Sequence, residues 1–196
     1  MSLQVENLRV YYQTLQGSIK ALDGATFSLA DSEIMGLAGE SCCGKSTLGY
    51  SLVYMNPRMR YIEGQVKLDD EELPIWDTEK MNAFRYEKVS IIPQYAMSAM
   101  NPTRKIGRMI ADLLATRRIE YRDILTDLKW RLNLVELNHN VLDMFPIELS
   151  GGMKQRMVMV LSTLLNPSLL IADEVTSALD VSTQKAVSRS EERRVG

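Results

Sequence analysis

The chain has 196 residues, 45% of them hydrophobic, so it can bury one sizeable core, and its length favours a single domain. Lysine and arginine total 23 against 25 aspartate and glutamate, and the net charge of −2 gives no electrostatic reason to expect nucleic acid as a partner. The only cysteines, Cys42 and Cys43, are adjacent, which excludes a disulfide framework or a zinc-ligand spacing. Neither a secretory signal nor an apolar run long enough to span a bilayer is visible, so we expect a cytoplasmic protein.

The N-terminal part alternates apolar and polar residues, as half-exposed strands do. Val5, Leu8 and Val10 lead into Tyr11 and Tyr12, and residues 25–29 and 64–69 alternate in the same way. This pattern predicts an antiparallel layer of strands.

A glycine-rich loop, residues 39–46 (GESCCGKS), follows an apolar stretch that we predict to be a strand, residues 33–38. An apolar helix through Leu48 and Leu52 is predicted after it, so the Walker A pattern stands in its required context. In such a loop backbone N–H groups wrap phosphates, Lys45 adds a cation at the outer phosphates, and the Ser46 hydroxyl helps to hold Mg²⁺. The loop therefore predicts nucleotide binding.

The middle of the chain predicts one short strand and then helices. Residues 89–92 are a compact β-branched strand that ends at Pro93 and Gln94, and residues 73–84 before it read as a loop with a short helix. Apolar residues recur at helical spacing over residues 106–114 and 121–135. The separation of Lys45 from Asp173 far exceeds what one βαβ crossover needs, so these helices are an insertion. His139, the only histidine, is expected on the surface after them.

Residues 149–156 (LSGGMKQR) predict the start of another helix. Ser150 can cap it, and Gly151 and Gly152 leave the backbone open, so an anion could bind at this N-terminus. The alternative for this stretch alone is an ordinary capped helix.

A continuous apolar strand, residues 168–172, ends in Asp173 and Glu174. Such strands suit parallel sheets, which bind ligands at their carboxyl ends. Asp173 is expected to hold Mg²⁺ through water, and Glu174 to orient or deprotonate the attacking water. The alternative is a strand that merely ends in surface acids.

Together, these motifs resemble the ATP-binding-cassette (ABC) ATPases over Leu3 to about Val187. Walker A, the Q-loop at Gln94, the signature octad, Walker B at Asp173 and the D-loop, residues 177–180, occur in the family's order. Met97-Ser98 followed by Asn101-Pro102 is typical of the dipeptide and oligopeptide importer branch.

The resemblance implies an α/β fold, an ABC-type P-loop NTPase core with an antiparallel β layer and an inserted helical subdomain at about residues 95–150. The domain would span residues 1–188. Catalytic roles fall on Glu174, Gln94 and Lys45, and Mg²⁺ would be held by Ser46, Gln94 and Asp173. The implied ATP-binding residues are Tyr12, which would stack on adenine with Tyr11 as its rival, and Gly39, Ser41, Cys42, Cys43, Gly44, Lys45, Ser46, Thr47, Ser150, Gly151, Gly152, Gln155 and Asp180.

The implied function is the ATPase subunit of an importer for peptides or related small solutes. Its partners would be a second ABC ATPase subunit, identical or paralogous, transmembrane permease subunits and, indirectly, a solute-binding protein. It would sit peripherally at the cytoplasmic face of the cell membrane. The alternatives are a nucleotide-binding cassette that does not hydrolyse ATP, and a soluble ABC ATPase that is not involved in transport.

The chain departs from the family's pattern at several points. Cys42 stands where the family usually has glycine, and a positive φ there would cost about 1–3 kcal/mol. Cys43 is expected to be an inert filler, with a reactive thiol as the alternative. Val175 replaces a usual proline, and no histidine follows His139 to contact the γ-phosphate. We therefore expect the domain to be cut short and the charged tail, residues 189–196, to be foreign, with a natural solvated helix end as the alternative.

Overall fold

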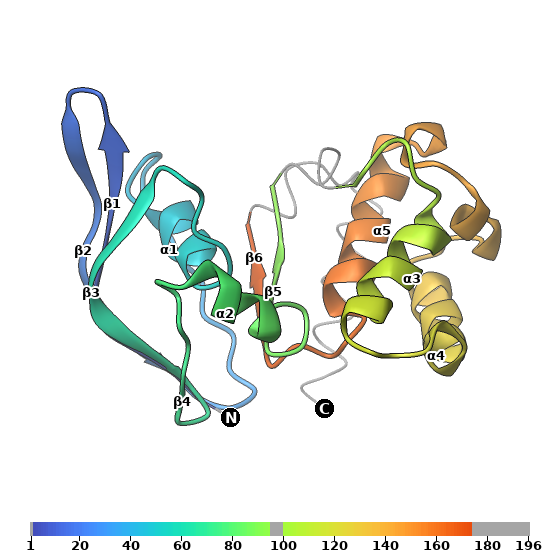
Figure 1. Cartoon of the computed structure of the whole chain (residues 1–196), viewed down its shortest axis with the longest axis horizontal. Helices are drawn as coiled ribbons and strands as arrows, with labels where there is room; N and C mark the ends of the chain where they lie inside the picture. Colours follow the sequence, from blue (N-terminus) through green and yellow to red (C-terminus); the bar gives the residue numbers. More distant parts are fainter. Residues whose placement is uncertain (1, 95–99, 174–196) are drawn as a thin grey trace. The chain divides into compact units, whose positions relative to one another are not determined.

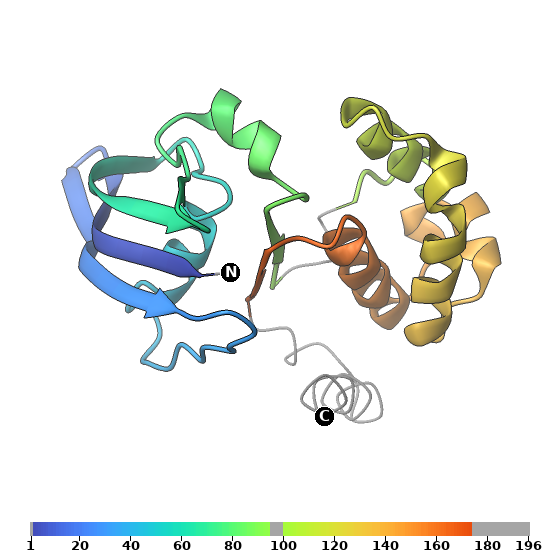
Figure 2. The ribbon, with the colours of Figure 1, turned by 90° about the horizontal axis from the view of Figure 1, so that it is seen from below.

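A computed structural model describes residues 2–94 and 100–173 of the chain. These residues form two compact units. The first contains residues 2–91 and 165–171, and the second contains residues 92–94, 100–164 and 172–173. In Figures 1 and 2 the first unit carries most of the strands and the second carries the longer helices.

An antiparallel sheet in the order β2-β1-β3-β4 is the frame of the first unit, which confirms the predicted layer. Its strands are β1 (Leu3–Thr14), β2 (Gly17–Leu29), β3 (Met59–Leu68) and β4 (Glu71–Glu72). The buried side of β1 changes phase between Val5 and Leu8, where the register also shifts. Gly64 lies opposite with a φ of +112°, and a Cβ there would stand 2.5 Å from the Leu8 Cα. Only glycine fits this irregularity.

Helix α1 (Lys45–Ser51) packs against this sheet, which curves around it in Figures 1 and 2. Leu48 and, just after the helix, Leu52 belong to one buried apolar cluster with Val5 and Val66 of the sheet. Burial of each leucine contributes about 1.5–3 kcal/mol. Gly49 lies so close to the strand of Ile171 that a Cβ would be 3.1 Å from the Ile171 Cγ2 atom. The glycine-rich loop therefore runs into a firmly packed helix.

Two of the predicted strands, β5 (Val89–Ile92) and β6 (Leu169–Ala172), pair with each other. The Leu169 N–H donates to the Lys88 carbonyl oxygen (2.8 Å) and the Asp173 N–H to that of Ile92 (3.0 Å). Because both bonds advance in the same direction along the two strands, the pair is parallel. The short helix predicted before β5 is α2 (Thr78–Phe84).

The strand predicted for residues 33–38 is wrong. These residues have no regular secondary structure and are exposed, with Ile34 at 76% and Leu37 at 50%. A strand needs a neighbour to receive its backbone hydrogen bonds, and among residues 2–94 and 100–173 neither sheet includes this stretch. Apolar composition alone therefore gave the wrong element.

The second unit is helical, as the spacing of apolar residues predicted. It contains α3 (Ile106–Thr116), α4 (Tyr121–Leu134) and α5 (Gly151–Thr163), with 3₁₀ turns η2 (His139–Asp143) and η3 (Pro146–Glu148). The helices lie side by side in Figures 1 and 2. They bury an apolar face that comprises Ile106, Ile110, Leu114, Leu128, Leu132, Met157, Val158 and Val160.

Helix α4 ends in a left-handed residue that is not glycine. Glu136 has a φ of +54°, and its N–H donates to the Asn133 carbonyl oxygen (3.1 Å). The next N–H, that of Leu137, donates to the Leu132 carbonyl oxygen (2.9 Å). This is the Schellman pattern, and both leucines are buried. The pattern fixes where the chain leaves α4.

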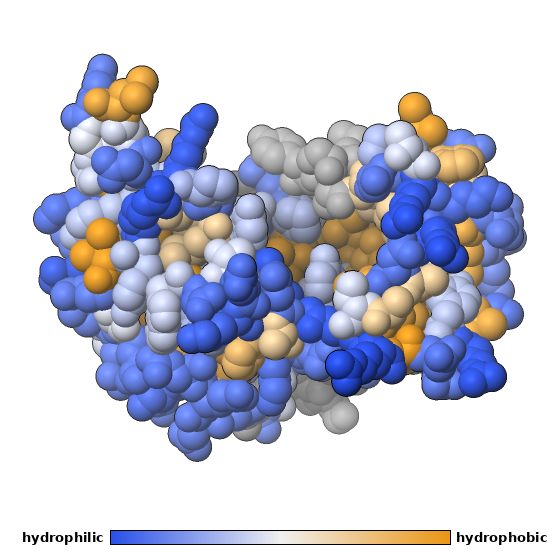
Figure 3. Space-filling view, viewed as in Figure 1, coloured by the Kyte–Doolittle hydropathy of each residue, from blue (hydrophilic) through white to orange (hydrophobic). Residues whose placement is uncertain are grey.

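The face drawn in Figure 3 is mainly hydrophilic, with hydrophobic side chains exposed in several places. Within the part of the chain that the structure describes, no helix combines the length and the apolar character needed to cross a membrane.

Candidate functional site

The glycine-rich loop closes onto α1 through Gly44, which precedes the helix with a φ of +96°. A Cβ at Gly44 would stand 2.4 Å from the carbonyl oxygen of Ala21 in β2. Both the left-handed backbone and this contact require glycine here. The loop is thus held against the antiparallel sheet as well as by its own helix.

Cys42 has a φ of +65°, so the position where the family usually has glycine is indeed left-handed. A side chain in this region costs about 1–3 kcal/mol relative to an extended or helical residue. The Cys42 side chain is exposed. The loop therefore adopts its conformation with a local strain that glycine would remove.

Lys45 turns its ammonium group back over the loop. Its Nζ atom donates to the carbonyl oxygens of Gly39 (2.8 Å) and Glu40 (2.7 Å) and lies 3.4 Å from the Cys43 Sγ atom. An ammonium has three donor positions, and here the loop itself supplies acceptors for them. The loop thus concentrates positive charge at its centre, where phosphate oxygens could take over these hydrogen bonds.

The residues after Lys45 differ in exposure. Ser46 is exposed at the start of α1, whereas Thr47 is buried at 8% exposure. Ser41 is exposed within the loop. Of the two hydroxyl groups that begin the helix, that of Ser46 is the more accessible to a ligand.

The two candidate adenine-stacking tyrosines face different surroundings. The Tyr11 hydroxyl donates to Asp23 Oδ1 (2.7 Å), and this hydrogen bond raises the tyrosine pKa above its usual value. Tyr12 is partly buried against the apolar cluster that holds α1. Tyr12 therefore lies on the α1 side of the sheet and Tyr11 is held by β2, which supports the choice of Tyr12.

Gln94 and Asp173 come from neighbouring strand ends. Gln94 follows β5 by two residues, Asp173 directly follows β6, and the Asp173 N–H is bonded to the last residue of β5. Both side chains have intermediate exposure. The structure thus brings together the β5 and β6 ends that carry two of the three predicted Mg²⁺ ligands. The third, Ser46, belongs to the first unit.

Helix α5 begins as predicted, with the Ser150 Oγ atom accepting a hydrogen bond from the Met153 N–H (3.3 Å). Gly151 and Gly152 are exposed, and a Cβ at Gly152 would meet nothing within 4 Å. Gln155 is buried at 8% exposure, and its Oε1 atom has no partner among the described residues. The backbone of Gly151 and Gly152 is therefore accessible at this helix N-terminus, and the buried side-chain amide of Gln155 lies one turn further along the helix.

Arg156 makes a contact that sequence reasoning did not predict. Its Nη1 atom donates to the carbonyl oxygens of Val135 (3.1 Å) and Glu136 (3.3 Å), at the end of α4. A basic side chain suits carbonyls that a helix end leaves unpaired. The last residue of the signature octad therefore ties α5 to α4. The only sequence signal was an arginine beside the apolar run of α5.

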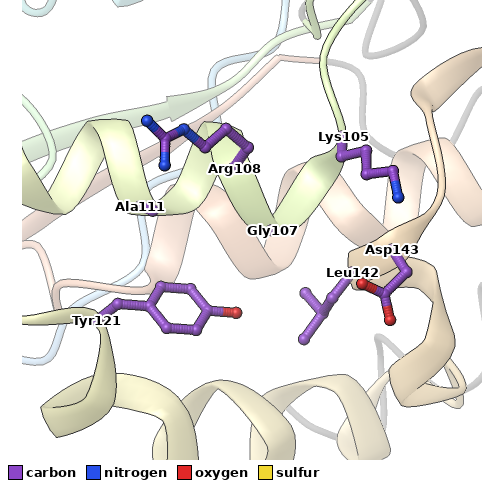
Figure 4. Close-up of a pocket in the computed structure, with 7 residues that line it drawn as sticks. All are labelled: Lys105, Gly107, Arg108, Ala111, Tyr121, Leu142 and Asp143. Carbon is purple, nitrogen blue, oxygen red and sulfur yellow. The ribbon is translucent and has the colours of Figure 1, made fainter.

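A hollow of about 300 Å³ lies on the helical unit, and none of the motif residues lines it (Figure 4). The ring of Tyr121 points into it, and burial and the nearby Asp143 carboxylate raise the Tyr121 pKa. Its lining residues are Lys105, Gly107, Arg108, Ala111, Tyr121, Leu142 and Asp143. His139, in the adjoining 3₁₀ turn, has intermediate exposure and shares a hydrogen bond with Asn133 (2.9 Å).

Several predictions fall outside the described residues: Glu174, Asp180, Val175, the D-loop and the tail at residues 189–196. Among the residues described, no group of three or more histidine, cysteine or acidic side chains forms a metal-binding cluster. The predicted Mg²⁺ ligand set includes a hydroxyl and an amide, so it is not a cluster of this kind.

Comparison with known proteins decides the family. The ABC transporter family model matches residues 22–177, which include every motif from Walker A to Walker B. The chain belongs to the ABC transporter family. A dipeptide transport ATP-binding protein, DppD, of Caldanaerobacter subterraneus is 35% identical over 93% of this chain and 57% of its own length. The oligopeptide transport ATP-binding protein OppD of Escherichia coli is 31% identical over 94% of the chain and 56% of its own length. The cassette thus spans little more than half the length of these relatives.

Solved structures show the same fold. A dimeric post-hydrolysis structure of the ATP-binding cassette MJ0796, bound to ADP and Pi, has a TM-score of 0.79 and 22% sequence identity. The match covers 98% of this chain and 84% of that one. The predicted family and the predicted α/β cassette fold are therefore both confirmed.

Proposed function

We propose that this cassette is the ATP-binding and ATP-hydrolysing subunit of an importer for peptides or related small solutes. The observation that carries the proposal is the Lys45 ammonium at the centre of a glycine loop, on a helix packed against β6. The names of the relatives, dipeptide and oligopeptide transport proteins, support the class of solute.

The donor set fits Mg²⁺, because Ser46, Gln94 and Asp173 offer a hydroxyl, an amide and a carboxylate oxygen, the hard ligands that this ion prefers. Bound Mg²⁺ would neutralise charge on the outer phosphates. When ATP binds, Lys45 exchanges its bonds to Gly39 and Glu40 for bonds to phosphate oxygens. Gln94 and Glu174 orient water for attack on the terminal phosphate, and Glu174 accepts its proton.

The proposal includes a second cassette, whose signature glycines would meet the ATP that the glycine-rich loop of the first cassette holds. The exposed N-terminus of α5, with Ser150, Gly151 and Gly152, offers backbone N–H groups to an anion held by a partner. The dimeric MJ0796 cassette supports such an arrangement. Permease subunits at the cytoplasmic face of the membrane would receive the motion of the pair.

ATP binding and phosphate release test this proposal. Equilibrium dialysis measures the ATP affinity of the unaltered chain and of Lys45→Ala. A phosphate-release assay compares the unaltered chain with Glu174→Gln. We expect Lys45→Ala to weaken binding at least tenfold and Glu174→Gln to abolish turnover. Binding without turnover in either chain would favour the non-hydrolytic alternative, for which the strained Cys42 is the supporting observation. If nucleic acid stimulates ATP turnover and permease subunits never do, the proposed transport role is wrong.

A further inference from the structure

The hollow on the helical unit is not explained by nucleotide binding, since none of its lining residues belongs to the motifs described above. Its volume of about 300 Å³ is at the lower end of the range for ligand sites, so it suits a small molecule. Its walls come from the start of α3, the first residue of α4 and the turn η2, all in the second compact unit. The hollow is therefore formed within one unit.

Two opposite charges lie at one end of the hollow. Figure 4 shows the Lys105 ammonium there, from the N-cap of α3, and the Asp143 carboxylate, from the end of η2. Both side chains are exposed, and within the described part of the chain neither charged group takes part in a hydrogen bond or an ion pair. A ligand with a single charge would be attracted by one of these groups and repelled by the other. The pair therefore favours a ligand that carries both charges.

The rest of the hollow is mainly apolar. In Figure 4 the ring of Tyr121 points along it toward Leu142, and Gly107 and Ala111 of α3 form the wall beside them. Gly107 allows η2 to approach α3, because a Cβ there would stand 2.9 Å from the Leu142 carbonyl oxygen. An apolar group of a ligand would lose its contact with water in this part of the hollow.

A second cation on the wall is already partly neutralised. Arg108 also lines the hollow, but its Nε atom lies 3.6 Å from Asp112 Oδ1. Asp112 accepts a further contact from the Arg104 guanidinium, so one carboxylate serves two arginines. The surroundings of the hollow therefore keep a moderate positive charge beside Lys105, which would favour the anionic group of a ligand.

The geometry points to this hollow as a binding site for a free α-amino acid with an apolar side chain. Its ammonium would pair with Asp143, its carboxylate with Lys105, and its side chain would pack against Tyr121 and Leu142. An α-amino acid carries both charged groups on one carbon atom, which matches two protein charges at the same end of the hollow. The site shares no residue with the nucleotide site, so this inference does not depend on the proposed function.

NMR titration of the isotope-labelled full chain with L-leucine, in the absence of ATP, tests the site. We expect a dissociation constant below about 1 mM, because two ion pairs and a partly buried apolar group act together. The backbone amide signals of Gly107 and Asp143 should shift. N-acetyl-L-leucine lacks the ammonium and L-leucinamide lacks the carboxylate, so each should bind at least about tenfold more weakly than L-leucine.

Variants assign each charge to its residue. Asp143→Asn should weaken the binding of L-leucine at least about tenfold and should not weaken that of N-acetyl-L-leucine, which has no ammonium to lose. Lys105→Ala should give the corresponding result with L-leucinamide. Lys129→Ala removes an exposed lysine of α4 that does not line the hollow, so it is the matched control and should bind L-leucine as the unaltered chain does.

The ligand series uses the unaltered chain, so it decides the question even if a variant fails to fold. Equal binding of L-leucine, N-acetyl-L-leucine and L-leucinamide would overturn the inference, as would shifts confined to amides outside α3, α4 and η2. If Asp143→Asn and Lys105→Ala are folded and bind L-leucine as Lys129→Ala does, the inference is also wrong. Failure to bind ATP would overturn the proposed function alone, because no nucleotide is present in this titration.

Discussion

Gly44 and Ala21 approach each other so closely that a Cβ on Gly44 would stand 2.4 Å from the Ala21 carbonyl oxygen. The glycine before Lys45 is therefore required for two separate reasons. Its φ of +96° disfavours any side chain, and β2 leaves no room for one. The antiparallel sheet thus shapes the loop from outside, although it contributes no residue to the motif.

Gly44→Ala should lower the free energy of unfolding by more than about 2 kcal/mol, because strain and the contact with Ala21 add together. ATP affinity should fall with it. Urea unfolding and equilibrium dialysis measure the two effects. Gly36→Ala is the matched control, since Gly36 lacks a positive φ and a Cβ there would meet nothing within 4 Å. Equal stability of the two variants would show that the loop can move away from β2.

Cys42→Gly should stabilise the chain by about 1 kcal/mol, because glycine relieves the strain of the left-handed backbone. This net gain allows for the opposing effect of glycine, which raises the conformational entropy of the unfolded chain. The control is Cys42→Ala, which removes the thiol but keeps the Cβ, and which should give no such gain. Thermal unfolding of both variants provides the comparison. A gain of the same size in Cys42→Ala would assign the effect to the sulfur and not to φ.

Much of this arrangement could be read from the sequence. Alternation in β1 and β3, and helical spacing in α3 and α4, identified these elements because burial imposes those periods directly. Motif spacing likewise placed Lys45 before a helix and Asp173 after a strand. Residues 33–38 failed because an apolar run acquires strand geometry only from a neighbour, and neighbours are set by the whole fold.

Contacts between distant parts of the chain could not be predicted. Nothing local shows that Gly44 meets Ala21 or that Arg156 reaches the carbonyl oxygen of Val135, since both depend on how elements distant in the sequence pack. The left-handed φ of Cys42 was predicted only as a conditional consequence of the family's glycine. Substitution by cysteine hides the usual sequence signal for such a conformation.

Arg156→Ala should destabilise the chain by about 1–2 kcal/mol, because it leaves the Val135 and Glu136 carbonyl oxygens without their donor. The matched control is Arg122→Ala, which removes the same charge from an exposed position on α4 whose ion pair with Asp123 is long (4.0 Å). Urea unfolding followed by circular dichroism reports the helical unit. If both variants unfold at the same urea concentration, the tie between α5 and α4 is energetically unimportant.

The N-cap of α2 should make stability depend on pH. Asp77 accepts hydrogen bonds from the Glu79 and Lys80 N–H groups (3.1 Å each), and the Lys80 backbone hydrogen bond is the main cause that lowers the Asp77 pKa. A lowered folded-state pKa means that the contribution is fully present above the ordinary aspartate pKa of about 3.9 and is lost as pH falls through the folded value. Asp77→Asn keeps a capping oxygen that does not titrate. The difference in melting temperature between the two chains should therefore shrink from pH 6 to pH 3, and a constant difference would contradict the capping role.

Removal of divalent ions should weaken ATP binding, and Asp173 should account for part of that dependence. For the unaltered chain, excess EDTA is expected to lower ATP affinity at least tenfold relative to Mg²⁺, because Ser46, Gln94 and Asp173 would then have no ion through which to hold the phosphates. Asp173→Asn should respond less to EDTA, since its own contribution is already lost. Asp70→Asn, an exposed aspartate in the turn before β4, is the control and should respond as the unaltered chain does. If Asp173→Asn and Asp70→Asn respond equally to EDTA, Asp173 does not contribute to the metal site. If EDTA leaves the ATP affinity of the unaltered chain unchanged, Mg²⁺ is not needed for nucleotide binding.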